Sequence, residues 1–194
     1  EIIREDLNEV AEKFGDDRRT VISPDADNDL SEEALVKKEE VFVSITQKGY
    51  IKRVSESTYR SQGRGGRGVI GQSMKDDEDE VKFFVRCHTL SILLFFTDKG
   101  KVYSEKVWQL PDEGRTGRGI PMFNIINIDA DEQVTAVVPV VDFADANYCT
   151  LATTKGRVKR VQMSEFESVR PSGLIAMNLD EDDNLGWACL TGGE

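Results

Sequence analysis

Glycines and arginines alternate in the segment Gln62-Gly63-Arg64-Gly65-Gly66-Arg67-Gly68. Glycine lets backbone N–H groups approach an anion closely, and arginine neutralises phosphate charge. We therefore interpret the segment as a clamp for a polyanion. A dinucleotide-binding loop fits less well, because its glycines must open a helix after a buried strand, whereas this segment follows the polar Tyr59-Arg60-Ser61. A Walker-type phosphate loop lacks its Lys-Ser/Thr ending here, and a plain solvated turn stays an alternative.

The spacing of glycine and arginine recurs further along the chain, which favours the clamp. A second copy is Gly114-Arg115-Thr116-Gly117-Arg118-Gly119, and Arg170-Pro171-Ser172-Gly173 is a fainter third copy. Each copy ends 17 to 19 residues after a turn of the form Thr-x-Lys-Gly, and these turns end at Gly49, Gly100 and Gly156. A self-similar period of about 50 residues is the mark of stacked or radially arranged units.

The elements that must position these loops are short strands. Each Thr-x-Lys-Gly turn lies between two apolar runs, and glycine supplies the positive φ that a tight hairpin needs. The expected hairpin strands are Val41–Ile45 with Tyr50–Val54, Ser91–Phe96 with Lys101–Ser104, and Tyr148–Thr153 with Arg157–Val161. A further strand is expected in each unit, at Val81–Arg86, Gln133–Val141 and Leu185–Leu190. The body is therefore predicted to be all-β with blade-like units.

Residues before the body follow other patterns. Glu1 to Lys13 has apolar residues at helical spacing, and Gly15 is a natural stop. Residues 1–22 are interpreted as a junction segment and residues 23–40 as an acidic linker that includes a brief helix over Leu30–Val36. The body then spans residues 41–194, with units near 41–90, 91–147 and 148–194.

The charge is divided unevenly along the chain. The formal net charge is −11, but residues 1–40 alone hold 14 acidic and 6 basic residues. The body is nearly balanced, and within it Gln47 to Ile70 carries six basic residues against one acid. Because local fields govern partners more than bulk charge does, an acidic protein can still carry a basic stripe. Acidic pairs close each unit, at Asp79-Glu80, Asp131-Glu132 and Asp182-Asp183, and we interpret them as solvated turns rather than a metal site.

Composition excludes several classes. The three cysteines are widely spaced and there is one histidine, so a zinc site is not expected. We expect the cysteines to be reduced thiols of a cytosolic protein. No apolar run is long enough to cross a bilayer, and no secretory leader is seen. We expect a cytoplasmic, nucleoid-associated protein with no metal and no cofactor of its own.

The glycine–arginine segment resembles the box motif that marks the A chain of bacterial DNA gyrase, a type IIA topoisomerase. The Thr-x-Lys-Gly repeats resemble the blades of the C-terminal domain in that family, and Gly15-Asp16-Asp17-Arg18-Arg19-Thr20 resembles the junction after its coiled coil. The resemblance covers essentially the whole chain. One departure is Gly63, where the family normally has a basic residue, and it weakens the box by one charge.

The resemblance implies a fold and a function. The fold is a β-pinwheel of propeller-like four-stranded blades that exchange strands, with about three blades in this chain, fewer than the family commonly has. We expect an open edge strand that permits self-association. The function implied is sequence-independent binding and chiral wrapping of double-stranded DNA in support of ATP-dependent negative supercoiling. The implied protein partners are the gyrase B subunits and the second of the two A subunits in an A2B2 enzyme, and no membrane is involved.

A row of basic residues on successive blades is expected to contact phosphates. The candidates outside the box are Lys52, Arg53, Arg60, Lys101, Lys106, Arg115, Arg118, Lys155, Arg157, Lys159, Arg160 and Arg170, and those within it are Gln62, Gly63, Arg64, Gly65, Gly66, Arg67 and Gly68. About half of the candidates are expected to touch DNA, and the rest to be ordinary solvated surface.

No catalysis is expected in this chain. The resemblance places the cleaving tyrosine, the ATPase, and with them ATP and Mg²⁺, in other parts of the enzyme. Two competing interpretations remain: the corresponding C-terminal domain of topoisomerase IV, which binds DNA with little wrapping, and a propeller that serves as a protein-binding platform. Salt distinguishes the platform, since an apolar protein interface does not weaken steeply with ionic strength.

Overall fold

The computed structural model describes residues 2–16, 32–59, 79–144 and 148–192 of the 194-residue chain. The chain divides into two units, Glu1–Ser31 and Glu32–Glu194. In the first, the predicted helix is present as α1 (Ile2–Phe14). It ends where the N–H of Gly15 donates to the Ala11 carbonyl at 2.9 Å, and a Cβ at Gly15 would lie only 2.3 Å from that oxygen. Among the described residues, no helix is long and apolar enough to span a bilayer.

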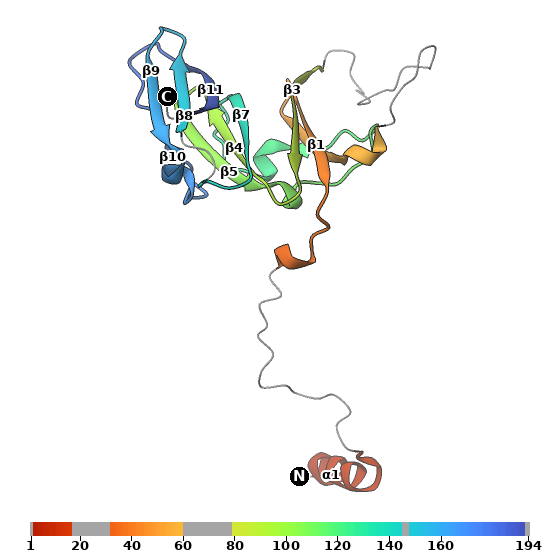
Figure 1. Cartoon of the computed structure of the whole chain (residues 1–194). Helices are drawn as coiled ribbons and strands as arrows, with labels where there is room; N and C mark the ends of the chain where they lie inside the picture. Colours follow the sequence, from red (N-terminus) through yellow and green to blue (C-terminus); the bar gives the residue numbers. More distant parts are fainter. Residues whose placement is uncertain (1, 17–31, 60–78, 145–147, 193–194) are drawn as a thin grey trace, which may run out of the picture. The chain divides into compact units, whose positions relative to one another are not determined.

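The described strands of the second unit form three antiparallel sheets (Figure 1). The first sheet has the order β3-β1-β2-β6 and consists of β1 (Glu40–Thr46), β2 (Tyr50–Ser55), β3 (Val81–His88) and β6 (Ile120–Pro121). The second has the order β10-β5-β4-β7 and consists of β4 (Ile92–Thr97), β5 (Lys101–Lys106), β7 (Val134–Val140) and β10 (Leu174–Ile175). The third has the order β11-β8-β9 and consists of β8 (Tyr148–Thr153), β9 (Val158–Gln162) and β11 (Leu185–Thr191).

The predicted all-β architecture is confirmed, and each predicted hairpin is found close to its expected bounds. Short 3-10 turns precede or follow the strands, at η1 (Glu32–Leu35), η2 (Glu56–Thr58), η3 (Val107–Gln109), η4 (Met122–Asn124) and η5 (Met163–Phe166). The brief helix expected over Leu30–Val36 is η1. Residues 17–31, which hold the end of the expected junction segment and the start of the expected linker, lie outside the described residues.

Strand exchange between units is also confirmed. β6 follows β5 in the sequence, yet it pairs with β2 of the preceding unit, with Ile51 opposite Ile120. β10 follows β9 and pairs in the same way with β5, with Val102 opposite Leu174. Each two-residue strand therefore ties its own unit to the one before it. β7 contacts both β3 and β11, so the third strands of the three units lie next to one another.

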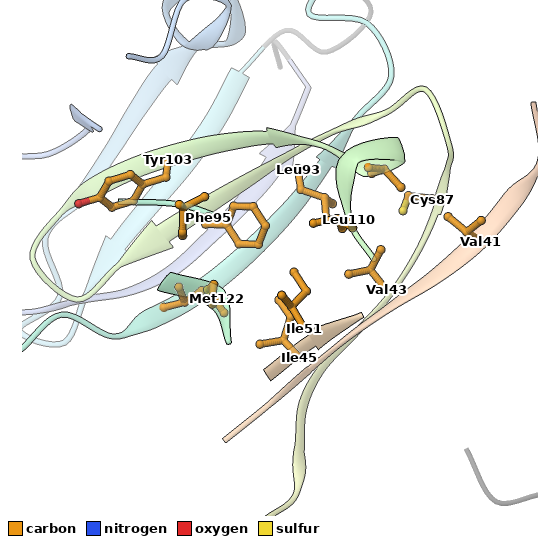
Figure 2. Close-up of a cluster of buried hydrophobic side chains, with 13 residues drawn as sticks. Val41, Val43, Ile45, Ile51, Cys87, Leu93, Phe95, Tyr103, Leu110 and Met122 are labelled. Carbon is orange, nitrogen blue, oxygen red and sulfur yellow. The ribbon is translucent and has the colours of Figure 1, made fainter. Parts of the chain in front are cut away.

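Among the residues that the structure describes, the core forms two clusters separated by β4. Leu93 and Phe95 point into the first, and Figure 2 shows them among side chains of the first sheet such as Val43 and Ile51. Leu94 and Phe96 point into the second cluster, which holds side chains of the third unit. Since successive side chains of a strand point to opposite faces, the continuous apolar run of β4 reflects burial on both sides.

The outer edge of the third sheet differs from the other two. Ile51 of β2 and Val102 of β5 are fully buried under β6 and β10, respectively. The residue at the same place after the third turn is Val158 of β9, and it is 67% exposed. Within the described part of the chain no strand pairs with β9 on this side. The edge is therefore uncovered in this structure.

The cysteines differ sharply in accessibility, which leads to a prediction about their reactivity. Cys87 and Cys149 are buried, and burial raises the pKa of each thiol to about 12, while Cys189 is exposed. Because the thiolate is the reactive form, iodoacetamide at mildly alkaline pH should modify one thiol per native chain, and mass mapping should place it at Cys189. All three should react in denaturant. Rapid native modification of Cys87 or Cys149 would contradict the core arrangement.

Candidate nucleic-acid interface

The Thr-x-Lys-Gly turns form a repeated scaffold on which the basic loops rest. Gly49, Gly100 and Gly156 have φ values of 79°, 75° and 85°, so each turn uses the left-handed region that glycine favours. The threonine that begins each turn is buried, and Thr46 and Thr153 accept the N–H four residues later at 3.1 Å. The three hairpins therefore end in the same geometry.

The acidic turns are only partly solvated, and the interpretation made from the sequence is wrong for one carboxylate of each pair. In each pair one carboxylate is buried, namely Asp79, Glu132 and Asp183. Asp79 accepts the N–H of Lys48 at 3.1 Å, and Asp183 accepts the N–H of Lys155 at 3.0 Å. These carboxylates hold the hairpin turns, which explains why the two motifs recur together. No group of metal-ligating side chains occurs among the described residues.

The carboxylates of the second and third units are satisfied by several donors. Glu132 accepts from the Thr97 hydroxyl at 2.6 Å and from the Tyr103 hydroxyl at 2.9 Å. Burial alone would raise the pKa of Asp183, but hydrogen bonds, including those from Thr153 and Lys155, outweigh it and leave this pKa below its usual value. The acidic turns thus belong to the scaffold.

The second glycine–arginine loop connects η3 to β6 and lies against β2. On one side of the loop, the carbonyl of Arg53 in β2 accepts the N–H of Glu113 at 3.1 Å, and the N–H of Arg53 donates to the Pro111 carbonyl at 2.9 Å. On the other side, Ile120 pairs with Ile51. Gly119, at φ 84°, has no room for a side chain, because a Cβ there would lie 2.4 Å from the Ile51 carbonyl oxygen. The loop is therefore fixed at both ends to the neighbouring unit.

Two of the predicted phosphate contacts are placed elsewhere by the structure. Lys52 is fully buried, and its Nζ donates to three carbonyl oxygens of the loop. The side chain of Arg53 is 14% exposed, donates to the Trp108 carbonyl at 3.1 Å and pairs with Asp112 at 3.4 Å. Both side chains hold the segment that runs from η3 to β6. They are therefore not placed to contact DNA phosphates.

Three other candidates are exposed or half-buried but already engaged with carboxylates. Lys101 pairs with Asp129 at 2.9 Å, and this hydrogen bond raises the pKa of the lysine. Lys106 pairs with Glu33 at 2.8 Å. Arg157 pairs with Asp180 at 2.7 Å. Since exposed ion pairs contribute little to stability, a phosphate could replace each of these carboxylate partners with a small loss.

Two exposed arginines stack on tyrosines, a feature that the sequence reasoning missed. The guanidinium of Arg118 lies 3.9 Å from the ring centre of Tyr50, and that of Arg160 lies 4.3 Å from the ring centre of Tyr148. Stacking on an aromatic ring orients a planar guanidinium at an exposed position, and an oriented guanidinium suits a phosphate ligand. The signal available in the sequence was the tyrosine that begins β2 and β8.

Some of the remaining predicted DNA-binding residues lie at the surface, and the others lie outside the described residues. Lys159 is exposed and donates to the Ala176 carbonyl at 2.7 Å. Lys155 and Arg170 are exposed, and Arg115 is half-buried. Arg60 and the box residues Gln62 to Gly68 lie outside the described residues.

The third loop is packed differently from the second. Gly173, at φ 81°, lies against the ring of Tyr103, and a Cβ there would be 2.8 Å from a ring carbon. Tyr103 occupies the place in β5 that Lys52 occupies in β2, counted from the threonine of each turn. In both units, this position of the hairpin therefore contacts the glycine loop of the unit that follows.

Comparison with known proteins agrees with this architecture. The family model for the DNA gyrase C-terminal domain, β-propeller, matches residues 40–88, 91–140 and 147–185. The chain is 42% identical over 194 residues to the DNA gyrase A protein of Halalkalibacterium halodurans, and 43% identical over 193 residues to that of Mycolicibacterium smegmatis. The match covers 100% of this chain and 23% of each relative, so the chain spans less than a quarter of their length.

Two solved structures of C-terminal domains have a similar fold. A crystal structure of the C-terminal domain of DNA topoisomerase IV superposes with a TM-score of 0.65 at 32% identity, over 80% of this chain and 47% of that one. A DNA gyrase A C-terminal domain superposes with a TM-score of 0.65 at 25% identity, over 80% of this chain and 49% of that one. The three matched segments each contain one Thr-x-Lys-Gly hairpin with the strands that flank it, and together they make up most of the chain: it belongs to the family of DNA gyrase A C-terminal domains.

Proposed function

We propose that this chain binds double-stranded DNA without sequence specificity and wraps it with a fixed hand. The observation that carries the proposal is the second glycine–arginine loop. Its backbone is fixed against β2, while Arg118 is exposed and stacked on Tyr50. The same loop type recurs in each unit of the sequence, so phosphate contacts would follow one another along a curved surface.

The energetics of wrapping require several such contacts. Duplex DNA is stiff over about 150 base pairs, so bending it around a small domain costs several kcal/mol that phosphate contacts must offset. Arg115, Arg118, Arg160 and Arg170 are the described arginines proposed for this role, and Lys155 and Lys159 are the lysines. Lys101, Lys106 and Arg157 would join them by exchanging their carboxylate partners for phosphates.

In the proposed context, the chain is the C-terminal part of a gyrase A protein. It would act in an A2B2 enzyme in the bacterial cytoplasm, where wrapped DNA is presented to the cleavage core for ATP-dependent negative supercoiling. The catalytic tyrosine and the ATPase would be supplied by other parts of that enzyme, together with its ATP and Mg²⁺. The chain itself is proposed to be a binding domain rather than an enzyme.

Binding of a labelled duplex at increasing salt tests the proposal. Release of counterions from 6 to 10 phosphates would weaken the affinity by about 10³-fold or more between 50 and 200 mM salt. The double variant Arg115→Gln/Arg118→Gln should lower the slope of log K against log salt by about 1.8. Lys38→Gln/Lys99→Gln removes the same charge from exposed positions outside the proposed set and should leave the slope nearly unchanged. Failure to bind the duplex even at low salt would contradict the proposal and favour a protein platform instead.

A topology assay separates wrapping from simple binding, which matters because the topoisomerase IV domain has the same fold. Nicked circles closed by ligase in the presence of the chain should show a shifted linking number of one sign. Arg64→Ala/Arg67→Ala tests the box, which lies outside the described residues, and should abolish that shift. Tight binding of wild-type chain without any shift would contradict wrapping and favour the topoisomerase IV alternative.

A further inference from the structure

Lys52 is a fully buried lysine in a strand whose partner elements come from two units. Its ammonium donates to the carbonyl oxygens of Gly114 at 3.3 Å, Arg115 at 2.5 Å and Gly117 at 2.9 Å. An ammonium has three N–H donors and no acceptor, so these three oxygens satisfy it. The acceptors all belong to the second glycine–arginine loop.

The cation stabilises the convergence of the three carbonyls. Their negative ends point at one buried position, where an apolar side chain would leave the Arg115 and Gly117 carbonyls without this donor and all three mutually repulsive. Burial lowers the pKa of Lys52, and the nearby carboxylate of Glu113 opposes that effect. Glu113 also closes the loop, since its carboxylate accepts the N–H of Gly119 at 3.0 Å.

The loop surrounds Lys52 because both of its ends are attached to β2 on either side of this residue. Arg53 exchanges backbone hydrogen bonds with Pro111 and Glu113, and Ile51 pairs with Ile120. Within the loop, the N–H of Gly117 donates to the Gly114 carbonyl at 3.0 Å. The carbonyls of Gly114, Arg115 and Gly117 therefore converge on the Lys52 ammonium as a group.

Strand geometry links Lys52 to Arg118 directly. Tyr50 and Lys52 are two residues apart on β2, so their side chains leave the same face of the strand. Lys52 binds the loop's carbonyls, and Tyr50 carries the Arg118 guanidinium 3.9 Å from its ring centre. One face of β2 thus contacts both the backbone of the loop and one of its arginines.

We propose that Lys52 is a positioning residue, whose buried ammonium shapes the second glycine–arginine loop so that Arg115 and Arg118 are presented to DNA phosphates. This proposal deepens the proposed function and rests on it. It assigns to Lys52 a role without phosphate contact, in contrast to the exposed arginines. The next unit has Tyr103 at this position, where the loop that it contacts carries the single arginine Arg170.

A double-mutant cycle with the full 194-residue chain tests the coupling. Lys52→Met keeps much of the side-chain volume but removes the ammonium, and we expect it to weaken binding of a labelled duplex about tenfold. Arg115→Gln/Arg118→Gln should weaken it by a similar factor, and the triple variant should be no weaker than this double variant. Multiplying effects, or unchanged affinity in Lys52→Met, would overturn the proposal. Lys99→Met, which removes an exposed charge outside the loop, is the matched control.

Amide exchange reports the loop without DNA, which separates this proposal from the proposed function. Lys52→Met should speed exchange of the Gly117 and Gly119 N–H groups about tenfold or more while Leu94 in β4 keeps its protection. Unchanged exchange at both glycines would overturn the anchoring role even if DNA binding fell. Faster exchange together with a wild-type chain that fails to bind DNA would support the anchor and overturn the proposed function, and with it the presentation of arginines to phosphate.

A wild-type measurement covers the case in which Lys52→Met does not fold. A buried ammonium on three carbonyls exchanges its protons slowly, so ¹⁵N–¹H spectra of the lysine Nζ groups should contain a protected signal that the exposed Lys99 lacks. Selective loss of that signal in Lys52→Arg, with other lysine signals retained, assigns it. Absence of any protected Nζ signal in the folded wild-type chain would overturn the placement of the Lys52 ammonium on three carbonyls.

Discussion

Replacing Gly100 by alanine is expected to separate the third unit from the second, because two penalties act at this one residue. Its φ of 75° disfavours any side chain, and a Cβ would lie 2.2 Å from the Met177 carbonyl oxygen and 3.2 Å from the Leu179 side chain. The Gly100 carbonyl also accepts the N–H groups of Ala176 at 2.9 Å and Met177 at 3.1 Å. Making room for a methyl group would strain the contacts that join the two units.

Gly49 supplies the matched control for this prediction. It has a φ of 79°, and its carbonyl accepts the N–H of Met122 at 2.8 Å, yet no atom lies within 4 Å of a Cβ built there. Gly49→Ala therefore isolates the backbone penalty and should cost about 1 kcal/mol. Gly100→Ala adds the collision and should cost about 3 kcal/mol or more.

Denaturant unfolding followed by tryptophan fluorescence measures both variants. Trp108 lies in η3 of the second unit and Trp187 in β11 of the third, so single-tryptophan versions locate the loss. In Gly100→Ala, the Trp187 transition should move to lower denaturant more than the Trp108 transition does. Equal losses in Gly49→Ala and Gly100→Ala would show that the close approach to Met177 does not constrain the fold.

The sequence predicted the long strands well because their signals are local. A Thr-x-Lys-Gly turn between apolar runs specifies a hairpin without information from other units. β6 and β10 were not located, and the reason is physical. A two-residue strand such as Ile120–Pro121 has no periodicity of its own, and it becomes a strand only by pairing with β2 of another unit. The resemblance to a strand-exchanged pinwheel, rather than any pattern, predicted that such strands exist.

The candidate site was predicted less completely because basic residues of two kinds look alike in a sequence. Lys52 and Arg118 both lie in basic segments of the chain, yet one is buried against carbonyls and the other is exposed on a tyrosine. The repeat did hold a signal, since Tyr103 stands in the second unit where Lys52 stands in the first. A position that alternates between tyrosine and lysine favours a partly buried site for a long side chain with a polar end.

The acidic turns also show that burial of a charged side chain could not be predicted from the sequence. An acidic pair such as Asp131-Glu132 does not reveal which carboxylate turns inward, and the structure buries the side chain of Glu132 to 1% exposure. The choice is made by the hairpin, because the Thr97 hydroxyl needs an acceptor inside the fold. Recurrence of the acids alongside the Thr-x-Lys-Gly turns was the available signal that they act together.

Glu132→Ala is therefore expected to destabilise the second unit by about 3 kcal/mol, because it leaves buried donors without an acceptor. The carboxylate accepts from the Thr97 hydroxyl at 2.6 Å and the Tyr103 hydroxyl at 2.9 Å, and it lies 3.6 Å from the Lys101 ammonium. Lys101 keeps Asp129 as a partner, so the loss comes mainly from the two hydroxyls. Glu132→Gln retains one acceptor oxygen and should lose less.

The neighbouring Asp131→Ala separates burial from charge in this prediction. Asp131 is exposed and pairs with Lys99 at 2.9 Å, so its removal deletes the same charge and should change stability little. Urea unfolding monitored at Trp108 compares the three variants in the unit that Glu132 supports. If Glu132→Ala proves no more harmful than Asp131→Ala, the buried carboxylate does not hold the hairpin. The acidic pairs would then be the solvated turns that the sequence first indicated.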